Sequence, residues 1–322
     1  MRRLLLLLCL GLTLACAAKA QTAEDRAAFA DVERALAEGL PDVQSLVVLQ
    51  RGRLAYQFHR DGSAETPRVV ASVTKSALST LVGIALGQGR IASLDQPVLE
   101  LMPEWKESNS DPRSASLTVR HLLTMTAGFD IGDDLTGTAR ALKPRDAWAR
   151  PLRAAPGQVF AYDNSLVPML AAIVEKASGS TIVDFARREL ATPLGMGAFD
   201  LRDGLRMRTI DMARLGQLYL QKGRWEGQQI VPEAYVTAAT QAQSAGGPPV
   251  SMPYGYMWWV TPAGQVFMAA GFGGQYIWVY PPLELVVAVH STPSLQSHLR
   301  GQATRLIRNG IFAAAQKRAA AP

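Results

Sequence analysis

The chain has 322 residues, of which 48% are hydrophobic, so it can bury a large core without disulfides or a structural metal. Its formal net charge of +6 is small for this length and its basic residues are scattered, which argues against nucleic-acid binding. The four histidines show no metal-ligand spacing and no glycine-rich phosphate loop occurs, so we expect no metal and no organic cofactor.

The first twenty residues have the layout of a secretory signal peptide. Arg2 and Arg3 precede an apolar stretch over residues 4–14, and small residues then lead up to Ala20. The apolar stretch is shorter than the roughly 20 residues that a membrane-spanning helix needs. We therefore expect cleavage after Ala20, export to the periplasm or the medium, and no stable membrane span.

Both cysteines, Cys9 and Cys16, lie in this leader, so the cleaved chain would contain no thiol. Cleavage would also remove three basic residues and no acidic one, which brings the chain closer to neutrality. A lipoprotein anchored through Cys16 is the less favoured alternative, because Thr13 stands where such processing sites usually carry leucine.

Two strands are predicted near the start of the mature chain and several helices after them. Residues 45–59 contain two β-rich runs around Arg51-Gly52-Arg53, which predicts a hairpin. Apolar residues at helical spacing then predict helices over 75–86, 165–177, 182–190, 209–220 and 232–239. Gly179 and Gly223 stand where helix C-caps are expected. The segment 130–143 is predicted to be a mobile loop excursion.

From Tyr254 onward the chain consists of short apolar and aromatic runs separated by Pro or Gly, which predict three or four antiparallel strands. The polar segment 241–253 is expected to connect the helices back to this sheet. A final amphipathic helix over 298–315 is expected to cover the sheet. Its apolar face would consist of Leu299, Ala303, Leu306, Ile307 and Ile311.

Strands at both ends with helices between them predict an α/β (α+β) fold. We expect one antiparallel sheet built from both termini and flanked by helices, with a mainly helical region inserted into it. The expected organisation is a single domain over 21–322. Its α/β part would comprise 21–75 and 246–316, and its helical part 76–245.

The first chemical motif is Ser72-Val73-Thr74-Lys75, at the change from a strand-like run to a helical pattern. A serine and a lysine three residues apart share one helical face, and helical side chains lean toward the N-terminus, so the amine reaches back to the hydroxyl. The positive end of the helix dipole would stabilise negative charge on the serine oxygen. Ser72 is therefore a candidate nucleophile and Lys75 its candidate proton acceptor.

The second motif is Tyr162-Asp163-Asn164, just before another predicted helix. A tyrosine, whose ordinary pKa is about 10, can exchange protons near neutrality only if a nearby cation such as Lys75 favours its phenolate. Asn164 offers an amide donor and an acceptor to a substrate amide. The alternative is a turn in which Asn164 only caps the following helix.

Together, Ser72-x-x-Lys75 and Tyr162-x-Asn164 resemble the first two motifs of class C beta-lactamases, related carboxylesterases and DD-peptidases. The linking segments resemble the family in the same order, over about residues 40–312. These segments are HLLTMTAG (121–128), Pro156-Gly157, PLGM (193–196) and RLG (214–216). The resemblance implies a beta-lactamase/transpeptidase-like fold and a serine acyl-enzyme.

The third motif of the family, usually Lys-Thr-Gly or His-Thr-Gly on an edge strand, aligns with Ala269-Ala270-Gly271. Alanines stand in place of the two polar residues of this motif, which argues against binding of a substrate carboxylate at this position. The resemblance further implies that Gly271 lets this strand approach closely, and that the N–H groups of Ser72 and Phe272 form the oxyanion hole. The run GFGGQ (271–275) and the pair of tryptophans at 258–259 resemble members named 6-aminohexanoate-dimer hydrolases.

The expected activity is hydrolysis of a small-molecule amide or ester, with Ser72 as nucleophile and with Lys75 and Tyr162 moving the protons. Two alternatives stay open. One is a catalytically silent module that binds cell-wall peptides in the same site, and the other is a true beta-lactamase or DD-peptidase. His121 is expected to be structural, because the proton-transfer roles are already filled.

Overall fold

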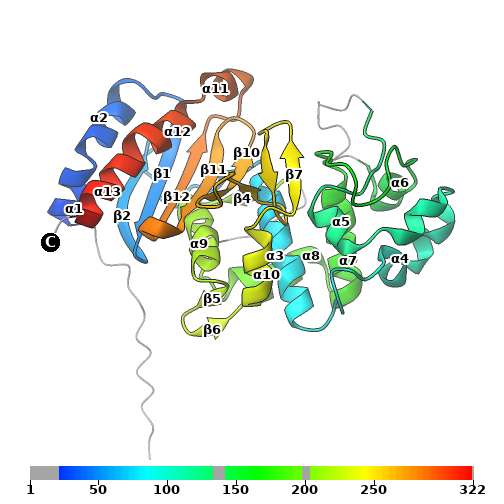
Figure 1. Cartoon of the computed structure of the whole chain (residues 1–322). Coiled ribbons are helices and arrows are strands. Elements are labelled where there is room, and N and C mark those ends of the chain that lie inside the picture. The colour runs from blue at the N-terminus through cyan, green and yellow to red at the C-terminus, as the bar shows by residue number, and fades with distance from the viewer. Residues whose placement is uncertain (1–21, 133–141, 198–203, 321–322) are drawn as a thin grey trace, which may run out of the picture.

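An antiparallel sheet of eight strands forms the centre of the structure (Figure 1). The computed structural model describes residues 22–132, 142–197 and 204–320. The strand order is β2-β1-β12-β11-β10-β9-β8-β7. The strands are β1 (Val43–Gln50), β2 (Arg53–His59), β7 (Ser244–Gly247), β8 (Met252–Tyr254), β9 (Trp259–Val260), β10 (Phe267–Gly271), β11 (Gln275–Tyr280) and β12 (Leu285–Ser291). The predicted fold class is confirmed, because strands from both ends of the chain share one sheet.

The hairpin predicted over residues 45–59 is formed by β1 and β2. Its two turn residues, Arg51 (φ 52°) and Gly52 (φ 70°), both adopt left-handed backbone conformations between the paired Gln50 and Arg53. Such a turn has the twist that two antiparallel strands require. β1 also pairs with β12, whose seven residues are all buried, so both faces of this part of the sheet must be covered.

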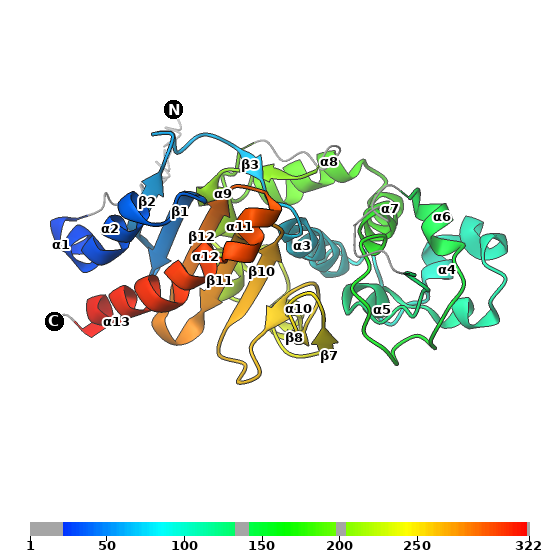
Figure 2. The same cartoon turned by 90° about the horizontal axis from the view of Figure 1, so that it is seen from above.

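Helices cover the two faces, as Figures 1 and 2 show. On one face α9 (Thr209–Leu220) packs against β1, β11 and β12. Gly216 permits this approach, because a Cβ there would lie 2.6 Å from Val286 and 2.7 Å from Ile277. The other face carries helices from both ends of the chain. They are α1 (Ala23–Ala28), α2 (Ala30–Glu38), α11 (Leu295–Arg300), α12 (Gln302–Arg305), the π-helical η6 (Leu306–Ile311) and α13 (Phe312–Ala320).

The single helix predicted over 298–315 is wrong in one respect, because Gly301 divides it. Gly301 (φ 57°) is left-handed and ends α11, and α12 begins at the next residue. Leu299 therefore lies on α11 with 75% of its surface exposed, while the other four predicted apolar residues are buried. The C-terminal cover of the sheet is formed from Ala303 onward.

The predicted helices of the middle region are confirmed. They are α3 (Val73–Gly87), α7 (Leu166–Ser178), α8 (Ile182–Ala186) continued by the π-helical η4 (Arg187–Ala191), α9, and α10 (Glu233–Ala239). Further short helices are α4 (Val98–Leu101), η1 (Pro103–Ser108), η2 (Pro112–Ser116), α5 (Val119–Leu123) and α6 (Pro144–Trp148). Two short strand pairs, β3 (Arg68–Val69) with β4 (Arg206–Met207) and β5 (Arg224–Trp225) with β6 (Gln228–Gln229), and the short 3-10 helix η5 (Pro281–Leu283) complete the elements of the described residues. Figure 2 shows α3 between the sheet and the group containing α4 to α7.

Two smaller predictions are corrected and one is confirmed. Gly179 (φ 68°) is the C-cap of α7, as predicted. The C-cap of α9 is Gln221 rather than Gly223; Gly223 is needed because a Cβ there would lie 2.1 Å from the carbonyl oxygen of Val231. The segment 241–253 is more than a connector, since it supplies the edge strand β7.

Some predictions fall on residues outside the described ranges. The signal peptide (1–20) and most of the excursion at 130–143 are among them, so both stay predictions. Within the described ranges, no single helix is long and apolar enough to cross a membrane. The two helical segments Leu166–Ser178 and Ile182–Ala191 would be long and apolar enough only if they are taken together, and they are bent by 77°.

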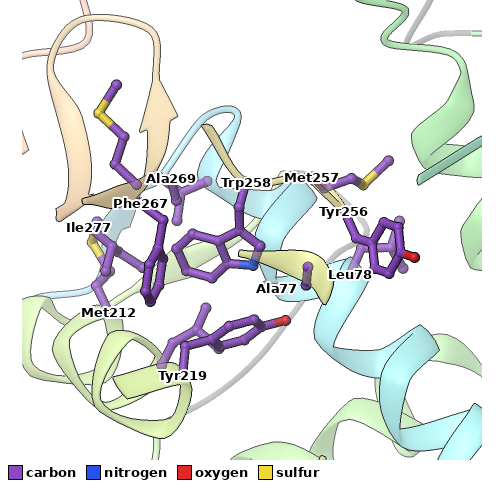
Figure 3. Close-up of a cluster of buried hydrophobic side chains, with 14 of the residues drawn as sticks. Ala77, Leu78, Met212, Tyr219, Tyr256, Met257, Trp258, Phe267, Ala269 and Ile277 are labelled. Atoms are coloured by element: carbon purple, nitrogen blue, oxygen red, sulfur yellow. The ribbon is translucent and has the colours of Figure 1, made fainter. Parts of the chain in front are cut away.

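A cluster of buried side chains joins α3, α9 and the sheet (Figure 3). Trp258 lies at its centre, with its ring centroid 4.5 Å from that of Tyr219 and 5.5 Å from that of Phe267. Two serines of α3 form hydrogen bonds with the loop between β8 and β9, which carries Trp258. Ser76 donates to the carbonyl of Met257 and Ser79 to that of Tyr256. The start of α3 is thereby held beside β10.

Candidate active site

Ser72 lies where the chain leaves β3 and enters α3. It is the half-buried N-cap of α3, and the preceding Ala71 has a φ of 48°, which is uncommon for a residue with a side chain. Such a conformation costs about 1–3 kcal/mol and is typically retained at functional sites. Tight turns follow at once, with Val73 N–H donating to Val70 and Lys75 N–H donating to Ser72.

Lys75 is one of the largest fully buried side chains, with 1% of its surface exposed. Its Nζ donates to Ser72 Oγ at 3.2 Å and to Asn164 Oδ1 at 2.7 Å. The first contact is the one that the Ser-x-x-Lys spacing predicts. The second joins two motifs that lie 89 residues apart in the sequence. Asn164 therefore contacts the lysine, and the N-cap of α7 is Ser165, so the alternative of Asn164 as a helix cap is wrong.

Tyr162 lies between Lys75 and an aromatic group. Lys75 Nζ is 4.5 Å from the centroid of the Tyr162 ring, and Trp259 stacks on that ring at 5.7 Å and 20°. Tyr254 packs edge-on against it at 6.3 Å. Burial raises the pKa of Tyr254 well above its ordinary value, so this second tyrosine stays neutral. Trp259 is 2% exposed, which makes it a support for Tyr162 rather than an open binding surface.

The turn that carries Tyr162 and Asn164 is fixed by residues that the sequence analysis did not single out. Asp163 is 4% exposed and forms an ion pair of 2.6 Å with Arg150. In the sequence, the only indication of a role for Asp163 was its place between two motif residues. No sequence pattern indicated Arg150, 13 residues earlier, because its contact with Asp163 depends on how the chain folds back.

Gly271 brings the end of β10 against the chain that precedes Ser72. A Cβ at this position would lie 2.5 Å from the carbonyl oxygen of Val70 and 3.2 Å from the Cβ of Ala71. Phe272 follows directly, and its half-exposed ring stacks on His298 at 5.2 Å. The structure thus brings Gly271 to the segment that leads into Ser72, and the oxyanion role of the Ser72 and Phe272 N–H groups stays a prediction.

The close approach at Gly271 leads to a testable prediction. Gly271→Ala is expected to push β10 away from Val70, destabilising the fold by about 1–3 kcal/mol and lowering kcat/KM about tenfold through misplaced backbone donors. Gly39→Ala is the matched control, because its Cβ would meet only Ala35 O at 3.7 Å. Thermal melting and ester hydrolysis measure both effects; equal behaviour of the two variants would contradict the prediction.

The other polar candidates have structural explanations. His121 Nδ1 accepts from Thr118 N–H at 3.2 Å in the capping box of α5, and burial lowers the pKa of its ring. His290 is fully buried beside Thr209, and burial lowers its pKa to about 3. In the part of the chain that the structure describes, no three His, Cys, Asp or Glu side chains could share a metal ion.

Comparisons with known proteins show the family of this chain and its similarity to known hydrolases. A family model described as Beta-lactamase matches residues 29–310. The 6-aminohexanoate-dimer hydrolase of Paenarthrobacter ureafaciens is 26% identical over 297 residues, which cover 80% of this chain and 74% of that protein. Esterase EstB of Burkholderia gladioli is 29% identical over 153 residues, or 39% of this chain and 36% of the esterase. A solved penicillin-binding protein homologue from Caulobacter crescentus has a TM-score of 0.74 at 17% identity, over 91% of this chain and 98% of that one.

Proposed function

We propose that this chain, which belongs to the beta-lactamase family, cleaves an amide or ester bond through an acyl-enzyme on Ser72. The family and the amidase and esterase relatives establish a hydrolase. The observation that supports the serine mechanism is the buried Lys75 Nζ, which lies 3.2 Å from Ser72 Oγ and 4.5 Å from the Tyr162 ring. Burial disfavours a charged amine in general, which suits a proton acceptor.

In the proposed cycle, Ser72 Oγ attacks the substrate carbonyl carbon while its proton passes to Lys75 Nζ. The carbonyl oxygen becomes an oxyanion that the N–H groups of Ser72 and Phe272 stabilise, by about 3 kcal/mol each. Collapse of the intermediate breaks the bond to the amine or alcohol, which takes its proton from the Tyr162 hydroxyl, and Lys75 returns a proton to Tyr162. Water then attacks the acyl-enzyme and gives a proton to the same pair. The bond to Ser72 Oγ breaks, the acid leaves, and Ser72 Oγ takes back a proton from Lys75.

The substrate is proposed to be a simple amide or ester rather than a beta-lactam. At the position where the family usually has Lys-Thr-Gly, Ala269 is buried and Ala270 is half-buried, and neither can bind a carboxylate. Asn164 supplies a polar side chain next to the nucleophile, although its Oδ1 is already engaged by Lys75. This leaves its amide N–H₂ as the group that a substrate carbonyl would contact.

The experiment that tests the proposal is intact mass spectrometry after incubation with a fluorophosphonate and, separately, with a p-nitrophenyl ester. We expect one adduct per chain in the wild type and none in Ser72→Ala. Ser116→Ala is the control, because this exposed serine donates to the carbonyl of Arg113 and has no part in the site. It should be labelled like the wild type.

Two outcomes would redirect the proposal. If neither reagent labels the wild type, the serine mechanism is wrong and the cell-wall peptide-binding module is favoured. Turnover of nitrocefin at a rate equal to that of the ester would instead favour a beta-lactamase.

A further inference from the structure

A buried ion pair lies directly behind the candidate catalytic turn. Tyr162 and Asn164 both contact Lys75, through the ring at 4.5 Å and through Oδ1 at 2.7 Å. Asp163, between them, binds a different partner: its Oδ2 accepts from Arg150 Nη2 at 2.6 Å. The side chain of Asp163 is thus held by other partners than those of its two neighbours in the turn.

The carboxylate of Asp163 is almost fully used. Its Oδ1 accepts from Ser165 N–H at 2.8 Å and from Ser165 Oγ at 2.7 Å, and Arg150 also contacts Ser165 Oγ. At 4% exposure, water cannot readily replace these contacts. Rotation of the turn about its backbone would therefore break several charge-assisted hydrogen bonds at once.

Arg150 is itself held in place from several directions. Its Nε donates to the carbonyl of Ala147 at 3.0 Å, and its own carbonyl accepts from Asn109 Nδ2 at 2.9 Å. The guanidinium lies 5.0 Å from the ring centroid of Phe129. The ion pair thus joins the turn to the packed interior of the group containing α5 and α6.

We propose that Asp163 and Arg150 are positioning residues for the reaction: their ion pair sets where Tyr162 and Asn164 meet Lys75. The proposal rests on the serine hydrolase function proposed above. Neither residue touches the substrate. Their effect is exerted through the Tyr162 hydroxyl and the Asn164 amide, because small displacements of reacting groups reduce rates steeply.

The chain contains a matched control for this ion pair. Arg318 and Asp25 form a contact of the same length, 2.6 Å, with side-chain exposures of 17% and 6%, against 16% and 4% for Arg150 and Asp163. That pair joins α13 to α1, on the helices that cover the sheet. Removing either carboxylate therefore removes a similar buried ion pair, but only one of the two pairs adjoins the site.

The experiment compares Asp163→Asn with Asp25→Asn. Both are expected to lower the melting temperature. Only Asp163→Asn is expected to lower kcat about 100-fold, to displace the acidic limb of the kcat/KM pH profile, and to change the near-ultraviolet circular dichroism of the Tyr162–Trp259 stack. Arg150→Lys, which keeps the charge but loses the planar fork, is the second variant if Asp163→Asn does not fold, with the same expected changes.

The outcomes separate this proposal from the proposed function. If Asp163→Asn and Asp25→Asn differ in neither kcat, pH profile nor near-ultraviolet spectrum, the ion pair only adds stability and the positioning role is overturned. If wild-type Ser72 is not labelled by the fluorophosphonate, the proposed function is wrong, and the near-ultraviolet spectra alone then test the positioning role. A spectral change in Asp163→Asn that is absent in Asp25→Asn would in that case support the positioning of Tyr162, whereas unchanged spectra would reject it.

Discussion

Replacement of Lys75 by methionine is expected to lower kcat/KM for an activated ester by about 10³-fold or more. Methionine fills a similar volume, but it cannot accept the proton of Ser72. Its thioether also cannot donate to Asn164 Oδ1, which the Lys75 amine contacts at 2.7 Å. Fluorophosphonate labelling should be slowed in parallel, since the loss lies in the attack by Ser72. A melting curve checks that the variant is folded.

Lys75→Arg tests whether the residue accepts a proton or only supplies charge. A guanidinium stays protonated at any ordinary pH, so it keeps the charge and loses the basic function. We expect Lys75→Arg to be as inactive as Lys75→Met. Lys176→Met, which removes an exposed ammonium paired with Glu104, should retain full activity. Retention of a tenth or more of the wild-type activity in Lys75→Arg would show that the lysine acts by charge alone.

Tyr162→Phe is expected to lower kcat by about 10²-fold to 10³-fold while leaving the melting temperature nearly unchanged. Phenylalanine keeps the ring that stacks on Trp259 at 5.7 Å and that faces Lys75 at 4.5 Å. Only the hydroxyl is lost, so the loss of rate measures proton transfer separately from packing. Stopped-flow measurement of acylation and deacylation should show both steps slowed, because the same hydroxyl is proposed to serve in each.

Tyr254→Phe is the matched control for this hydroxyl. Tyr254 packs edge-on against Tyr162, and burial raises its pKa far above the range in which it could exchange protons. Removal of the Tyr254 hydroxyl should therefore leave the pH profile of kcat unchanged. If Tyr254→Phe and Tyr162→Phe reduced kcat equally, the aromatic packing rather than the Tyr162 hydroxyl would be responsible.

Several features of the candidate site could be predicted from local sequence alone. Ser72 and Lys75 meet because three residues along a helix return a side chain to the same face, and this contact is present at 3.2 Å. The hairpin at Arg51-Gly52 follows from the β-rich runs on either side and from Gly52, which readily adopts a left-handed backbone conformation. The order of the motifs indicated that Tyr162 and Asn164 belong to the same site, but not which atoms they contact.

The break between α11 and α12 was missed although it has a local cause. The apolar periodicity of residues 298–315 continues through Gly301, but a left-handed glycine commonly ends a helix. Other features depend on contacts that no local pattern contains. The support of Tyr162 by Trp259 depends on the loop between β8 and β9, which α3 holds through Ser76 and Ser79.

The sequence by itself therefore determined the fold class and the identity of the candidate nucleophile and its lysine, because hydrophobic periodicity and helical spacing act over a few residues. The tertiary structure decided which side chains complete the site. It placed Asn164 on Lys75, Gly271 against Val70, and Arg150 behind Asp163. Those contacts join segments that are far apart or folded back on one another, so no pattern of a few neighbouring residues contains them.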